Sequence, residues 1–172
     1  MRKNLDELTI MNIKLHLLPK LLKRSISVFL IVLIFGYFSG LDLLKHTTSF
    51  NAQGVEQNVL GNEFDENASE LHFKMSEREL QGIIHSHVIP LSMLFLILSI
   101  LLFFTSLPPF VKSFLMIEPN VSLMLTFGGL WLLWLGYSEV KYLIMISGVL
   151  MHLSIAVIVV LLLKELLFKK AN

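Results

Sequence analysis

Three histidines within apolar sequence are the residues of this chain best suited to chemistry. His85 and His87 flank Ser86 and are followed by Pro90, while His152 lies in the middle of a long apolar run. Imidazole can ligate haem iron or another metal and can relay protons near neutral pH. On a regular helix, residues two apart point about 200° apart. His85 and His87 therefore cannot face one ion unless Pro90 unwinds the turn.

The depth of each histidine decides whether two of them could share a b-type haem. If the second apolar helix enters the membrane near Ile83, His87 lies about 6 Å deep, whereas His152, about twelve residues into its own helix, lies roughly 18 Å deep. If the helix instead enters near Arg78, the mismatch falls from roughly 12 Å to about 4.5 Å, which tilt could absorb. A haem b ligated by these histidines is one hypothesis. The alternatives are that His152 relays protons, or that it is a neutral imidazole hydrogen-bonded across the bundle to Ser147, Ser154 or a backbone carbonyl.

Three glutamates are the remaining polar candidates. Glu118 precedes Pro119 near the start of the third apolar run. Proline suits the first position of a helix, so we expect the spanning helix to begin there, with Glu118 hydrated just outside it. The alternative is that Glu118 is a proton or cation site. Glu56 and Glu63 belong to an acidic segment between the first two apolar runs. A loop of that length more often has a function or serves as a docking surface than lacks a role.

Four apolar stretches must position these side chains, at about 26–44, 83–105, 114–135 and 140–163. A helix of about 20 residues crosses a hydrocarbon core roughly 30 Å thick. Of the 172 residues, 55% are hydrophobic and 16% charged, whereas a soluble domain has about 25% charged residues. The sequence predicts an all-α, polytopic membrane protein. Residues 25–172 are expected to form one four-transmembrane-helix bundle, and its segment 45–82 to hold an outer loop of about 30 residues.

Two local patterns refine this picture. Ser76 followed by Glu79 is a capping box, which predicts that the second helix begins there, ahead of the membrane. Residues 1–24 form a basic segment that either lies in the lipid headgroup plane or remains a partly ordered tail. There are no cysteines, so disulfides, thiolate metal sites and cysteine nucleophiles are excluded.

The distribution of basic residues predicts the orientation. They concentrate before the first apolar run, between the second and third, and in the C-terminal tail. They are Arg2, Lys3, Lys14, Lys20, Lys23, Arg24, Lys112, Lys164, Lys169 and Lys170. The positive-inside rule therefore places both termini in the cytoplasm. The net charge of +1 gives no indication of nucleic-acid binding.

Several short motifs follow one another along the chain: Gly54 to Glu56, Gly61-Asn62-Glu63, His85-x-His87 at the start of a membrane helix, Ile117-Glu118-Pro119, and Thr126-Phe127-Gly128-Gly129-x-Trp131-Leu132. With these motifs the chain, from its first helix onward, resembles a family of small four-span inner-membrane proteins of Gram-negative bacteria. The resemblance implies a location in the bacterial inner membrane and draws attention to His85, His87 and the outer Gly/Glu loop. It implies no activity. Ile84 stands where that family often has threonine, so no hydroxyl-assisted role is carried over there.

The small number of polar groups within the apolar runs favours a function without catalysis. We expect an accessory or scaffold protein of the lipid bilayer that docks a membrane-protein partner through its acidic outer loop, or that forms a homo-oligomer. The alternative is a redox bundle that binds haem b or a metal through His85, His87 and His152, with His46 or His72 as further ligands. A small transporter is less favoured, because the sequence shows no inverted repeat.

Overall fold

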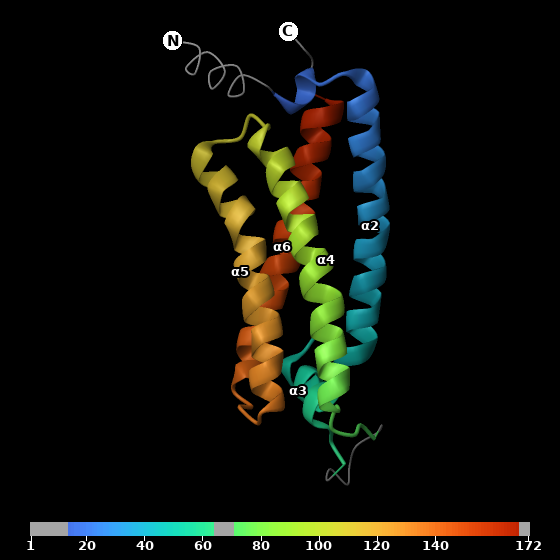
Figure 1. The fold of residues 1–172 in the computed structure, drawn as a ribbon, viewed down its shortest axis with the longest axis vertical. Helices are drawn as coiled ribbons and strands as arrows, with labels where there is room; N and C mark the ends of the chain where they lie inside the picture. Colours follow the sequence, from blue (N-terminus) through green and yellow to red (C-terminus); the bar gives the residue numbers. More distant parts are fainter. Residues whose placement is uncertain (1–13, 64–70, 169–172) are drawn as a thin grey trace.

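The computed structural model describes residues 14–63 and 71–168, and the regular secondary structure of these residues is entirely helical. Its elements are η1 (Leu15–Leu17), α2 (Lys20–Thr48), α3 (Ala52–Leu60), α4 (Glu77–Phe103), α5 (Pro109–Trp134) and α6 (Val140–Leu167). Figure 1 shows the four long helices side by side in one elongated bundle. The short helix α3 lies at one end, called here the α3 end, and η1 lies at the opposite end with the last turn of α6. The prediction for the basic segment falls partly on residues 1–13, outside the described residues.

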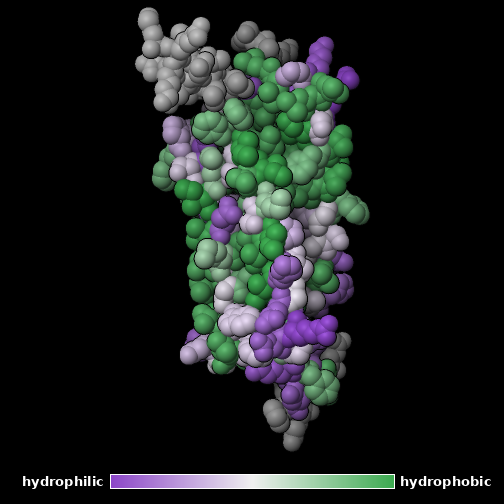
Figure 2. Space-filling model, in the orientation of Figure 1, coloured by the Kyte–Doolittle hydropathy of each residue, from purple (hydrophilic) through white to green (hydrophobic). Residues whose placement is uncertain are grey.

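Each of the four long helices is long and apolar enough to cross a membrane, with a mean hydropathy between 1.2 for α5 and 2.7 for α6 over the best window. Lipid offers no hydrogen bonds to the backbone, so an apolar run of this length is stable there only as a helix. Figure 2 shows hydrophobic side chains over most of the visible face, and hydrophilic ones gathered most densely near the α3 end. The predicted all-α four-helix membrane bundle is confirmed.

The start of α4 is the one expected from its capping box. The Ser76 hydroxyl accepts a hydrogen bond from the Glu79 N–H at 3.3 Å, and the Glu79 carboxylate accepts one from the Ser76 N–H at 2.8 Å. These reciprocal bonds satisfy two backbone donors that a helix N-terminus otherwise leaves free. The helix then continues through Pro90 without interruption.

The expected start of the third spanning helix is wrong. Helix α5 begins at Pro109, with Pro108 as its N-cap, ten residues before the expected position. A proline pair already supplies a helix start there, and Pro119 inside the helix removes only one backbone bond, which a membrane helix tolerates. Pro119 is fully buried. Glu118 is consequently a helical residue within the bundle rather than a hydrated residue before it.

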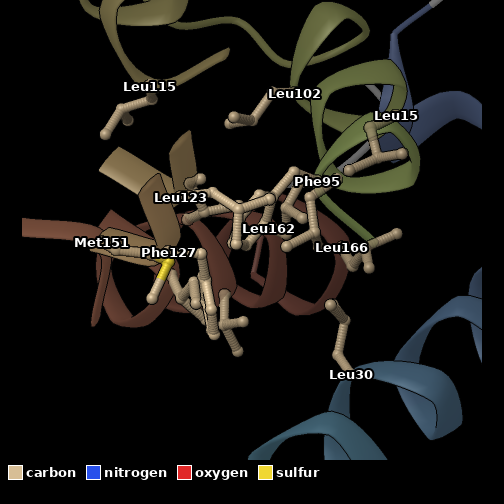
Figure 3. Packing of buried hydrophobic residues seen from close by; sticks show 14 residues of the cluster. Leu15, Leu30, Phe95, Leu102, Leu115, Leu123, Phe127, Met151, Leu162 and Leu166 are labelled. Carbon is tan, nitrogen blue, oxygen red and sulfur yellow. The ribbon is translucent and has the colours of Figure 1, made fainter. Parts of the chain in front are cut away.

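The core lies among α4, α5 and α6 and receives one leucine each from η1 and α2 (Figure 3). Helices α5 and α6 form an antiparallel hairpin in close contact. A Cβ atom added at Gly129 would lie 2.7 Å from Cγ1 of Ile144, and the hydroxyls of Thr126 and Ser147 are 2.8 Å apart. Helix α2 packs less closely. In its most apolar window 6% of residues are buried, against 39% in α5 and in α6.

Candidate functional site

His87 lies on the exposed side of α4, close to α5. Its ring stacks on that of Phe127 with 5.5 Å between centroids. Its Nδ1 is 2.8 Å from the Ile83 carbonyl oxygen and 3.1 Å from the Ser86 hydroxyl. A carbonyl oxygen can only accept, so in the neutral imidazole the bond to Ile83 assigns the proton to Nδ1 and the lone pair to Nε2. His85 is also exposed, two residues earlier on the same uninterrupted helix.

His152 lies on α6 and is half-buried. Its Nδ1 donates to the Gly148 carbonyl oxygen at 2.7 Å. The expected carbonyl partner is therefore present, but it belongs to the same helix. The contact across the bundle is made by Tyr37 of α2, whose ring centroid lies 5.8 Å from that of His152 and whose hydroxyl donates to the His152 carbonyl at 3.3 Å. Sequence reasoning missed Tyr37, because nothing local links residues so far apart in the chain.

The structure does not bring His87 and His152 together. The contact between Thr126 and Ser147 sets the register of α5 against α6. In that register His152 is level with about residue 121 of α5, whereas His87 packs at the level of Phe127, about 9 Å away along the axis. The two imidazoles also face different helices, α5 and α2. Within the described residues, no group of three or more His, Asp or Glu side chains could hold a metal ion.

An ion pair joins α3 to the start of α6. Nζ of Lys141 donates to Glu56 at 2.6 Å, and the two side chains are only 13% and 17% exposed. The hydrogen bond from Lys141 lowers the pKa of the Glu56 carboxyl. Asn51 caps α3, because its side-chain oxygen accepts from the Gly54 N–H at 2.7 Å. Glu56, chosen from the sequence as a polar candidate, therefore holds the α3 end together.

Residues 71–75, called here the strap, cross the α3 end with their backbone fixed at both ends. The Asn62 N–H donates to the His72 carbonyl at 2.8 Å, and the Asn62 side chain accepts from the His72 N–H at 2.6 Å. The Met75 N–H donates to Val59, and the Met75 carbonyl accepts from the Trp134 indole at 2.7 Å. The strap is thus a fixed part of the bundle.

Gly61 lets the strap approach α3. Its φ of +80° is unfavourable for other residues, and a Cβ atom there would lie 2.6 Å from the Lys74 backbone nitrogen.

Two strap side chains point away from the protein, since Leu71 is 59% and Phe73 71% exposed. Glu63, the third acidic candidate, is exposed next to Asn62. The loop acids Asp65, Glu66 and Glu70 lie outside the described residues.

Glu118 lies within α5 and is half-buried. The Ser122 hydroxyl donates to its Oε1. Its Oε2 is buried and, among the described residues, has no hydrogen-bond partner. Buried polar atoms without partners are uncommon in native proteins, so each calls for a physical account.

The opposite end carries a polar cluster that the sequence did not indicate. His16 Nδ1 lies 2.9 Å from a Glu165 carboxylate oxygen, which also accepts from the Ser106 hydroxyl at 3.0 Å. Lys112 donates to the Phe103 and Thr105 carbonyls, both at 2.9 Å. The contact of His16 with Glu165 joins η1 to the end of α6, and the bonds from Lys112 join the start of α5 to the end of α4 and the residues just after it. A hollow of about 310 Å³ adjoins them, lined by Thr105, Leu107, Leu161, Lys164, Glu165 and Phe168.

A family model described as a transmembrane helical domain matches residues 49–172. The match begins directly after the last residue of α2 and includes α3 and the three long helices that follow. No curated protein and no solved structure matches the chain.

Proposed function

Since the chain belongs to the Aq_1264_TM family of transmembrane helical domains, we propose that this multi-pass membrane protein is a non-catalytic component of the bacterial inner membrane that docks a partner protein at its α3 end. On this proposal the α3 end faces outward and both termini face the cytoplasm. The described basic residues support that orientation, because the opposite end holds more of them. They are Lys14, Lys20, Lys23, Arg24, Lys112 and Lys164, against Lys45, Lys74, Arg78 and Lys141 at the α3 end.

The observation that carries the proposal is the strap. Its backbone is held by hydrogen bonds to Val59, Asn62 and Trp134, yet Leu71 and Phe73 remain largely exposed. A surface that is ordered before binding loses little conformational entropy when a partner docks, so more of the contact energy appears as affinity. Large apolar side chains within a polar rim are the usual anchors of such interfaces.

Glu63 adds a charge beside these anchors. Its side chain is exposed next to the bonds that hold the strap. A partner surface with basic residues around an apolar pocket would complement this arrangement. Exposed charge at an interface rim acts mainly on association rate and salt dependence, whereas buried apolar anchors determine dissociation. Glu63 and the pair Leu71 and Phe73 therefore have separable roles.

The test is quantitative copurification of the full-length chain from its native membranes in mild detergent. We expect one protein near one-to-one stoichiometry with the wild type. Replacing Leu71 and Phe73 by serine should reduce its yield more than tenfold, since two anchors at about 2 kcal/mol each exceed the 1.4 kcal/mol that changes an equilibrium tenfold. Phe168→Ser is the matched control, because Phe168 is 79% exposed at the opposite end. Unchanged partner recovery in the double variant, or turnover by the isolated chain, would contradict the proposal.

A redox or metal-binding function is the second candidate, and one specific observation favours it. Both His87 and His152 use Nδ1 to donate to a backbone carbonyl, which leaves Nε2 able to ligate a metal. Because the two rings face different helices, two histidine ligands to one haem would have to come from two copies of the chain.

An oxidised-minus-reduced visible spectrum with metal analysis tests this second candidate. Haem near one per pair of chains, with a Soret band lost in His152→Ala, would establish it. A colourless, metal-free preparation would reject it.

A further inference from the structure

Glu118 lies well inside α5, a helix long and apolar enough to cross a membrane. Helix α5 has 26 residues and is therefore about 39 Å long, with Glu118 about 13.5 Å from its first residue. A hydrocarbon core of roughly 30 Å centred on this helix would begin about 4.5 Å inside its end. The carboxyl group then lies about 9 Å inside the core.

No cation compensates this carboxyl group within the described residues. On the facing part of α6 the register places Ser154 and Ile155, and α4 contributes Ser99, whose hydroxyl donates to the carbonyl of Met116 at 3.2 Å. Figure 3 shows Leu123 and Phe127, further along α5, lying against α6 in the apolar core.

Two ionisable side chains come nearest along α5 and α6. Lys112 lies six residues earlier on α5, about 9 Å along the helix axis, and donates to two backbone carbonyls. His152 of α6 faces Tyr37 of α2. Neither forms an ion pair with Glu118 among the described residues, and ionised carboxylates without a partner are costly in an apolar interior.

The oxygen without a hydrogen-bond partner favours a carboxylic acid over a carboxylate. Oε1 accepts from the Ser122 hydroxyl, as either form of the group can. No group donates a hydrogen bond to Oε2, so a charged Oε2 would be an unsatisfied acceptor. A proton on Oε2 would instead let this oxygen donate a hydrogen bond. An acceptor exists one turn earlier. Pro119 has no N–H, so the Leu115 carbonyl lacks its usual helical partner.

We propose that Glu118, Ser122 and the Leu115 carbonyl form an intramembrane proton-binding site. One proton from water converts the Glu118 carboxylate to a carboxylic acid on Oε2. Ser122 donates to Oε1, and the new hydroxyl donates to the Leu115 carbonyl, which Pro119 leaves without its usual helical N–H donor. Deprotonation returns the proton to water and leaves the carboxylate. This site is independent of the docking surface, because it lies within the helices rather than on the strap.

Infrared spectroscopy at pH 7 tests the proposal on the full-length protein in a detergent without ester groups. We expect a carbonyl stretch from about one protonated carboxyl group per chain. The band should shift in heavy water, as an exchangeable acid requires. Glu118→Gln should abolish it. Ser122→Ala should keep the band but move it to higher frequency, because the carbonyl oxygen loses a hydrogen bond.

Glu63→Gln is the control, since Glu63 is an exposed carboxyl group whose loss should leave the band unchanged. Size-exclusion profiles and helical circular dichroism establish that each variant is folded, and Glu118→Asp provides a second carboxyl variant if the amide destabilises the bundle. Absence of the band in the wild type, or its persistence in folded Glu118→Gln, would overturn the proposal.

Discussion

Replacing Gly129 by alanine tests the packing of α5 against α6. A Cβ atom at this position would lie 2.7 Å from Cγ1 of Ile144 and 3.3 Å from Cγ1 of Val140. Carbon atoms in contact are about 3.5–4.0 Å apart, so Ile144 would have to retreat by about 0.8 Å. Its side chain is buried, and branching at Cβ restricts its χ1 rotation. The methyl group therefore strains the contact between the helices.

We expect Gly129→Ala to lower the free energy of unfolding by about 1–3 kcal/mol, the usual loss when extra atoms are added to a well-packed core. Gly128→Ala is the matched control, because a Cβ atom there meets nothing within 4 Å. Both variants change glycine to alanine in the same helix, so a difference between them isolates the contact with α6 from any change in helix propensity. With a shift of about 2–4 °C per kcal/mol, Gly129→Ala should melt about 2–12 °C below Gly128→Ala.

Thermal unfolding in one detergent, followed by size-exclusion chromatography of the heated samples, measures this difference. Ile144→Ala should relieve the clash, so the double variant with Gly129→Ala should lose less stability than the two single changes added together. Equal melting temperatures for the variants at 128 and 129 would show that the helices do not meet at Gly129. If the stability losses of Gly129→Ala and Ile144→Ala simply add in the double variant, Ile144 is not the side chain that the new methyl group contacts.

Two further predictions concern polar contacts between elements. Because Lys141 lowers the pKa of Glu56, their pair contributes full stability above the ordinary Glu pKa of about 4.3 and loses it as the pH falls through the lowered value. Melting temperature should therefore fall more steeply on acidification in the wild type than in Glu56→Gln, and parallel profiles would count against the pair. Thr126→Val removes the bond to Ser147 and should cost about 0.6 kcal/mol, the average for hydrogen bonds between membrane helices. Thr47→Val, which loses only bonds within its own exposed helix turn, should cost less, and an equal loss would refute the interhelical contribution.

The spans were predictable from sequence because lipid imposes a simple rule on them. A run of about 20 apolar residues must be a helix there, whichever helix it later contacts. The capping box at Ser76 was equally visible, since all its bonding atoms lie within four residues. The start of α5, in contrast, could not be predicted from the sequence. Pro109 and Pro119 both suit the first position of a helix, and a membrane helix tolerates proline, so local rules could not choose between them.

Contacts between distant residues account for what the sequence did not reveal. The indole of Trp134 fixes the strap through Met75, 59 residues away. Tyr37 reaches His152 from 115 residues away. No pattern along the chain indicates such pairs, because each depends on how helices rotate when they pack. Glu118 could be named from sequence, but its bond to Ser122 became interpretable only once α5 was known to be continuous.

The unequal packing of the helices separates the candidate sites. Only Leu30 and Thr48 of α2 are buried, and an apolar hollow of about 190 Å³ lies between α2 and α6. Lipid tails are as apolar as leucine, so nothing drives a helix to close such a gap unless specific contacts do. The family match begins at residue 49, where α2 has ended. The strap and Glu118 therefore lie within the matched domain, whereas the Tyr37 that contacts His152 lies outside it. A function based on the strap or on Glu118 needs only the matched helices, but a role for His152 that works through Tyr37 also depends on how α2 is held against α6.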